Sequence, residues 1–75
     1  MLSHIYRIAC HFENTHGYRP NLLYINRIHY YHLKQQLNNV SMDHIRQLLQ
    51  MELILTNDAI HPHVAAVRLQ QQNTG

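Results

Sequence analysis

Apolar residues recur at helical spacing in the first part of the chain. The apolar positions are Leu2, Ile5, Ile8, Ala9 and Phe12. Their i, i+3, i+4, i+7 spacing predicts a helix from about Leu2 to Thr15. Gly17 stands where a left-handed residue would end this helix, and Pro20 pushes the residue before it out of the helical region. An extended segment should therefore follow the helix.

A short, continuous apolar run from Leu22 to Ile25 lies between two asparagines. A run of this length without alternation is typical of a strand that is covered on both faces. Asn26 can act as the N-cap of a second helix, which we expect from about Arg27 to Leu37. The apolar side of that helix consists of Tyr30, Leu33 and Leu37. The pattern therefore predicts a strand followed directly by a helix.

The second half of the chain adds one more helix and two more strands. Ser41 is the next candidate N-cap, and the apolar stripe after it predicts a short helix ending near Gln50. Residues 51–56 and 63–69 are rich in apolar side chains and predict strands, whereas residues 57–62 predict a loop. We expect the last two strands to pair as an antiparallel hairpin.

The order of these elements, α-β-α-α-β-β, predicts a single small α+β domain. The helical connection between the first two strands should make them parallel. A three-stranded mixed sheet then forms, with the helices packed mainly on one face and a C-terminal hairpin. Residues 1–69 make up this domain, and the polar residues 70–75 form a flexible tail. With 75 residues, of which 45% are hydrophobic, the chain has enough apolar material for one core and no more.

The helix over residues 27–37 carries a second apolar side. Ile28, Tyr31 and His32 lie at i, i+3 and i+4, away from the first apolar side. Either the core side is rotated from the one assumed, or the helix over residues 2–15 covers the second side, or a protein partner does. Tyrosine suits a partner surface because it combines a large contact area with a hydroxyl group. Our leading interpretation is a protein-interaction module with these residues as its contact face, and a homodimer as one form of that interaction.

The histidines are the compositional outlier, with eight in the chain. His61 and His63, two apart at the start of a strand, would place both imidazoles on one side, where they could reach one metal ion. His29 and His32, three apart on a helix, could supply a second pair. The oxygen ligands that could join them are Asp58 and Glu52. The alternative is that His61, beside a proline, only shapes a turn. The second hypothesis is therefore a zinc-binding or pH-responsive domain.

The sequence contains no recognisable catalytic motif. Cys10 is the only cysteine, which rules out an intramolecular disulfide and a thiolate-rich zinc site. The chain has two glycines, so it has no glycine-rich phosphate loop. A small enzyme of unknown reaction stays as a third hypothesis, with no catalytic residue assigned to it.

Charge and hydropathy bear on partners and location. The six basic residues behind the formal net charge of +2 are spread along the chain, which argues against nucleic-acid binding. The best local argument for nucleic-acid binding is that Tyr18 could stack on a base and Arg19 could contact a phosphate, beside Pro20. This segment is too short to support such a function. No apolar run reaches the roughly 18 residues that a membrane-spanning helix needs. His4 and Arg7 stand where a signal peptide would have an uninterrupted apolar stretch. We therefore expect a cytoplasmic protein that does not contact a membrane.

Two blocks of the chain resemble small uncharacterised bacterial proteins. They are His16 to Asn26 (HGYRPNLLYIN) and His61 to Val64 (HPHV). The resemblance implies a stand-alone bacterial domain, and it carries over no activity and no catalytic residue.

Overall fold

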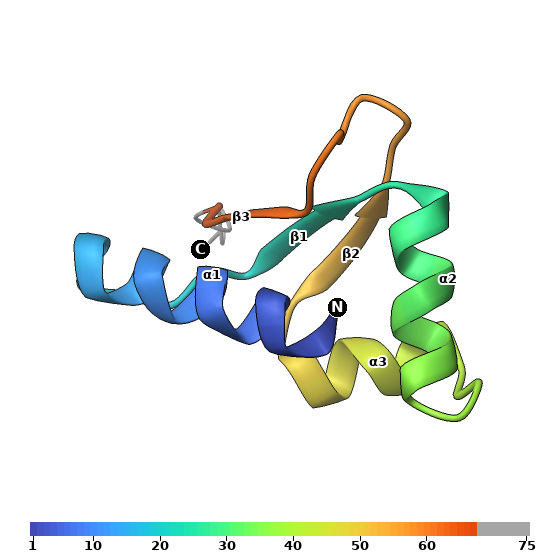
Figure 1. Cartoon of the computed structure of the whole chain (residues 1–75). Helices are drawn as coiled ribbons and strands as arrows, with labels where there is room; N and C mark the ends of the chain where they lie inside the picture. Colours follow the sequence, from blue (N-terminus) through green and yellow to red (C-terminus); the bar gives the residue numbers. More distant parts are fainter. Residues whose placement is uncertain (68–75) are drawn as a thin grey trace, which may run out of the picture.

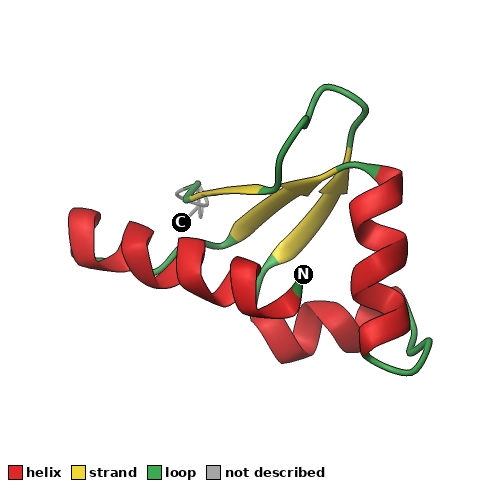
Figure 2. Ribbon diagram, in the orientation of Figure 1, coloured by secondary structure: helices red, strands yellow, loops and turns green. Residues whose placement is uncertain are grey.

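The computed structural model describes residues 1–67 and shows helices packed against a small sheet (Figure 1 and Figure 2). In chain order the elements are α1 (Leu2–His16), β1 (Leu22–Ile25), α2 (Arg27–Gln36), α3 (Met42–Leu49), β2 (Glu52–Leu55) and β3 (His63–Ala65). This order confirms the predicted α-β-α-α-β-β arrangement and the α+β class. The predicted end of the domain at Leu69 and the predicted tail over residues 70–75 lie outside the described residues.

The helix ends follow the local signals in the sequence. Gly17 adopts the left-handed conformation after α1, with φ of 82°. The Asn26 side chain caps α2 by accepting a hydrogen bond of 2.8 Å from the backbone N–H of His29. Ser41 caps α3 in the same way. These caps satisfy backbone N–H groups that have no partner within their own helix, and they confirm the predicted helix starts.

The strands form one sheet in the order β2-β1-β3. β1 and β2 run parallel, with Leu23 opposite Leu53, as the helical crossover predicts. β3 runs antiparallel to β1, with Leu23 opposite Val64. The predicted hairpin between the last two strands is therefore wrong, because β1 lies between them. Within the described chain, β3 also ends at Ala65, earlier than predicted.

The segment 56–62 carries the chain from β2 to β3 past the end of β1 (Figure 1). The outer strands lie roughly 10 Å apart, which is twice the spacing of neighbouring strands, and a segment of this length spans that gap. Thr56 N–H donates to the Ile25 carbonyl at 3.0 Å, and Asn26 Nδ2 donates to the Ala59 carbonyl at 2.9 Å. Pairing with the central strand replaces a local hairpin because the connection is tied to the end of β1.

The core lies on one face of the sheet, where all three described helices contribute to it. Figure 1 shows α1 and α3 beneath the sheet and α2 beside the end of β1. The buried side chains of the core are Ile5, Leu23, Ile25, Leu33, Ile45, Leu49, Met51 and Leu53. They come from the helices, from the alternate positions of β1 and β2 that face them, and from the turn before β2. The prediction that the helices pack mainly on one face is confirmed.

The opposite face of the sheet has no helix over it among residues 1–67. Leu22 and Tyr24 on this face are only half-buried, whereas Leu23 and Ile25 on the other face are fully buried. This alternation has the period of two that a strand with one covered face shows. The prediction that the first strand is covered on both faces is therefore wrong. We call this side, defined by Leu22, Tyr24 and the neighbouring Ile54, the uncovered face.

Candidate functional site

Helix α2 turns one apolar side to the core and a second one to solvent. Leu33 is fully buried, and Tyr30 and Leu37 pack against the core. On the other side Ile28 is 68% exposed and Tyr31 is 57% exposed. The core side is thus the one predicted from the sequence. Within the described chain, neither a rotated helix nor α1 accounts for the second apolar side.

The three residues of the predicted contact face lie together on this outer side of α2. His32 is exposed beside Ile28 and Tyr31. The Tyr31 hydroxyl oxygen accepts a hydrogen bond of 3.1 Å from Gln35 Nε2, on the same side of the helix, and the hydroxyl keeps its own proton for donation. The outer side therefore offers an aliphatic side chain, an aromatic ring and polar groups at neighbouring positions.

Asn26 caps the start of α2 and ties it to the segment 56–62. Its Oδ1 accepts from the His29 N–H at 2.8 Å, while its Nδ2 donates to the Ala59 carbonyl at 2.9 Å. One side chain thus joins the end of β1, the first turn of α2 and the segment 56–62. The N-cap role follows from sequence, but the bond to Ala59 depends on a contact between distant parts of the chain.

The histidine pair at the start of β3 has a different arrangement from the one predicted. His63 is the first residue of β3, and its ring stacks on Tyr24, with centroids 4.9 Å apart and planes 18° apart. The stack forms because Tyr24 and His63 are opposite each other in the antiparallel pair. His61 precedes the strand, and its carbonyl lies 3.4 Å from His63 Nδ1. Because His61 lies outside β3, the two-residue period of a strand does not apply to the pair of His61 and His63.

The two histidine pairs do not assemble into a metal site. His29 is half-buried with no hydrogen-bond partner for Nδ1 among the described residues, and His32 is exposed. The carboxylate of Glu52 pairs with Arg46 Nε at 2.5 Å. Within residues 1–67, no three side chains of His, Cys, Asp or Glu form a group that could hold a metal ion. The zinc hypothesis receives no support from this geometry.

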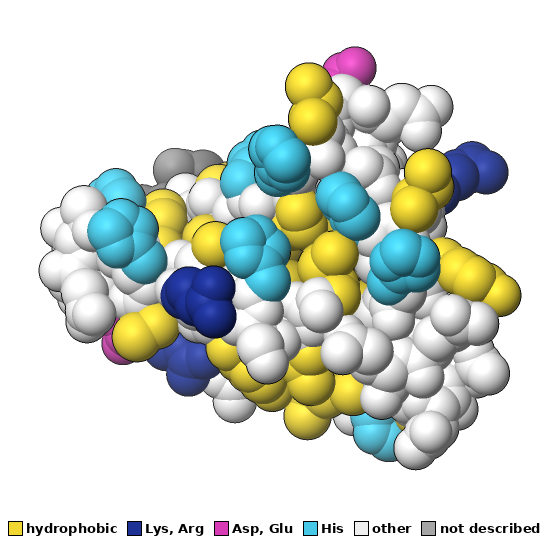
Figure 3. Space-filling view, in the orientation of Figure 1, with side chains coloured by type: hydrophobic (Ala, Val, Ile, Leu, Met, Phe, Trp, Pro, Cys, Tyr) yellow, Lys and Arg dark blue, Asp and Glu magenta, His cyan; other side chains and the backbone are white. Residues whose placement is uncertain are grey.

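Histidines are nevertheless prominent on the surface. Figure 3 shows them distributed over one side of the molecule with apolar side chains between them. His11, His16 and His63 line a shallow hollow of about 240 Å³ between α1 and β3. His16 stacks on Phe12 with ring centroids 4.0 Å apart, and its Nδ1 lies 3.0 Å from the Phe12 carbonyl. This contact serves a carbonyl near the C-terminus of α1, as expected for a basic residue at a helix end.

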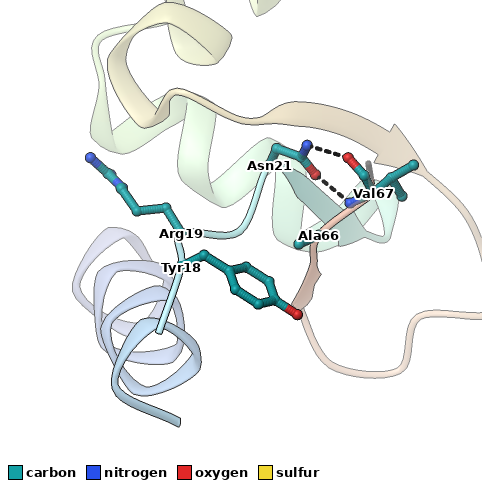
Figure 4. A pocket seen from close by; sticks show the side chains of 5 residues that line it. All are labelled: Tyr18, Arg19, Asn21, Ala66 and Val67. Carbon is teal, nitrogen blue, oxygen red and sulfur yellow. Dashed lines mark hydrogen bonds between the residues drawn. The ribbon is translucent and has the colours of Figure 1, made fainter. Parts of the chain in front are cut away.

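A second hollow, of about 460 Å³, lies beside the segment that joins α1 to β1 (Figure 4). The Asn21 side chain forms two hydrogen bonds of 2.8 Å with the backbone of Val67 and so extends the pairing of β1 beyond β3. Figure 4 shows Tyr18 and Arg19 pointing in different directions. They do not converge on one point, so the stacking and phosphate contacts considered for nucleic acid are not combined there.

A third hollow, of about 260 Å³, lies at the uncovered face. Its lining side chains are Tyr24, Ile54, Thr56, Asp58, Ala59 and His63. Sequence analysis missed this group because strand register brings it together. The signal that was present in the sequence is modest: Thr56 ends the predicted strand over residues 51–56, and Asp58 lies in the predicted loop that follows.

Comparisons of the chain with protein-family models, curated proteins and solved structures gave no match. Among residues 1–67, no helix has both the length and the hydropathy needed to cross a membrane. A functional proposal for this chain therefore rests on the chemistry of its own surfaces.

Proposed function

We propose that this chain is a protein-interaction module that associates with a second copy of itself through the outer side of α2. The observation that carries the proposal is the joint exposure of Ile28 and Tyr31 on a helix whose opposite side already supplies the core. Tyrosine is enriched in the buried centres of protein interfaces, where charged residues are depleted. We also propose, as the sequence predicts, that the protein is bacterial and cytoplasmic.

A second copy suits this surface because the centre of the surface holds no Lys, Arg, Asp or Glu. An interface with two-fold symmetry places the same residues of both copies opposite each other. Ile28, Tyr31, His32 and Gln35 include no Lys, Arg, Asp or Glu, so no pair of like charges has to be buried at the centre of the contact. Two basic residues, Arg27 and Lys34, lie beside Tyr31 on the same helix, where they form the rim. The tyrosine hydroxyl and the histidine ring provide hydrogen-bonding groups at the same place.

Native mass spectrometry of the tag-free protein at neutral pH, with and without a slight excess of zinc, tests the proposal. We expect a dimer that does not depend on zinc. Tyr31→Glu should weaken the dimer by about tenfold or more, since it truncates an interface tyrosine and adds a like charge to both copies. Tyr6→Glu is the matched control, because Tyr6 is a helical tyrosine on α1 with a similar exposure of 48%.

The outcomes separate the hypotheses. A monomer at all concentrations, or equal loss of the dimer in Tyr31→Glu and Tyr6→Glu, would contradict association through α2. A dimer that forms only when zinc is present, with the metal retained, would favour the histidine hypothesis instead. The far-ultraviolet circular dichroism of both variants should match that of the parent protein, since both tyrosines lie on exposed sides of their helices.

A further inference from the structure

The hollow at the uncovered face lies where the two parallel strands end. Tyr24 and Ile54 are register partners near the carboxyl ends of β1 and β2, and Thr56 and Asp58 follow β2 directly. In sheets with parallel strands, ligands bind in the crevice outside the carboxyl ends of the strands, between the loops that leave them. This hollow lies at the corresponding end of the one parallel strand pair within residues 1–67.

An aromatic ring forms one wall of the hollow. His63 stacks on Tyr24 from the β3 side, at a centroid distance of 4.9 Å. Ile54 lies on the β2 side of the same tyrosine. Tyr24 is half-buried, and its ring, the His63 imidazole and Ile54 all line the hollow. An aromatic face carries partial negative charge and attracts cations.

The hollow also contains one carboxylate, that of Asp58, beside the neutral hydroxyl of Thr56 and the imidazole of His63. Asp58 is the only Asp, Glu, Lys or Arg among the lining residues. Neither of the ion pairs within residues 1–67 involves it. The hydroxyl oxygen of Thr56 accepts a hydrogen bond of 3.2 Å from the Asp58 backbone N–H, which holds the two side chains on the same turn.

We propose that this hollow binds a small organic amine in its cationic form. The ammonium group pairs with the Asp58 carboxylate, and the apolar part of the amine lies against Tyr24 and Ile54. A carboxylate beside an aromatic face is the combination that favours an organic cation over a neutral or anionic molecule of the same shape. None of the lining residues belongs to the outer side of α2, so the site is independent of self-association.

Titration of the ¹⁵N-labelled full chain with benzylamine, followed by amide chemical shifts, tests this inference. We expect saturable shifts at the amides of Ile54, Thr56 and Ala59. Benzyl alcohol carries the same ring with a neutral group, and benzoate carries it with an anionic group. Benzyl alcohol should bind more weakly than benzylamine, and benzoate should bind more weakly still. Equal shifts from benzoate, or no saturable shift from benzylamine, would overturn the proposal.

Two matched variants locate the charge that matters. Asp58 is exposed, so Asp58→Asn should weaken benzylamine binding by about threefold to fivefold, the upper end of what one exposed ion pair contributes. Glu13→Gln removes the same charge from the exposed surface of α1 and should leave binding unchanged. Equal weakening by Asp58→Asn and Glu13→Gln would show attraction to net charge alone and would contradict the site.

Discussion

The two sides of α2 carry similar side chains but have different surroundings. Leu33 on the inner side is fully buried, whereas Ile28 on the outer side is 68% exposed. Both sides combine an aliphatic residue with a tyrosine at helical spacing, so composition does not tell them apart. Helix α2 therefore supplies more apolar surface than the core of this small domain covers. Contact between two copies is where we propose that the excess is buried.

The largest expected effect is the difference between truncating the two sides. Leu33→Ala should destabilise the fold by about 2–5 kcal/mol because it leaves a cavity in the core. Ile28→Ala should change the stability of the monomer by less than about 0.5 kcal/mol, since an exposed side chain contributes little burial. Urea unfolding at protein concentrations too low for a dimer measures both values. Equal losses would contradict the assignment of the inner and outer sides.

A smaller effect is expected at the start of α2. Asn26→Ala removes both the cap and the bond to the Ala59 carbonyl, and it should cost about 1–2 kcal/mol. Asn26→Asp keeps an acceptor for the His29 N–H and places a negative charge at the helix N-terminus, so it should cost less. Urea unfolding of the two variants measures this difference. If both variants lost the same stability, Asn26 would act mainly by holding the segment 56–62.

The smallest effect is expected at the ion pair that joins α3 to β2. Arg46 Nε lies 2.5 Å from a Glu52 carboxylate oxygen, and Arg46 also pairs with Asp43. Because these side chains are partly exposed, Glu52→Gln should cost at most about 1 kcal/mol, and the loss should shrink in high salt. Unfolding in low and high salt measures it, with Glu13→Gln as the control. If Glu52→Gln lowered the free energy of unfolding as much as Leu33→Ala does, the ion pair would contribute as much as a core side chain, which would contradict this interpretation.

Local chemistry made the helices predictable. Asn26, Ser41 and Gly17 act through bonds and backbone conformations that depend on their near neighbours, and such signals are readable in one sequence. Helical periodicity placed Ile28 and Tyr31 together on a second side of this helix. The sequence left open whether the first helix covers that side, and the structure shows both residues exposed.

Strand order and the hollow at the uncovered face depend on contacts that no local pattern contains. The last two strands read as a hairpin because they are close in sequence, but the segment 56–62 is held at the end of β1 by Asn26. The stack of Tyr24 on His63 likewise depends on the register of β3 against β1. Register is a non-local property that is set by which strands become neighbours.

The most direct test of association through α2 is an isotope-filtered nuclear Overhauser experiment on an equimolar mixture of ¹³C-labelled and unlabelled protein. It detects only contacts between different copies. We predict intermolecular signals between the Ile28 methyl groups of one copy and the Tyr31 ring of another. Intermolecular signals confined to the uncovered face, at Leu22 and Ile54, would contradict the account and move the interface from the helix to the sheet.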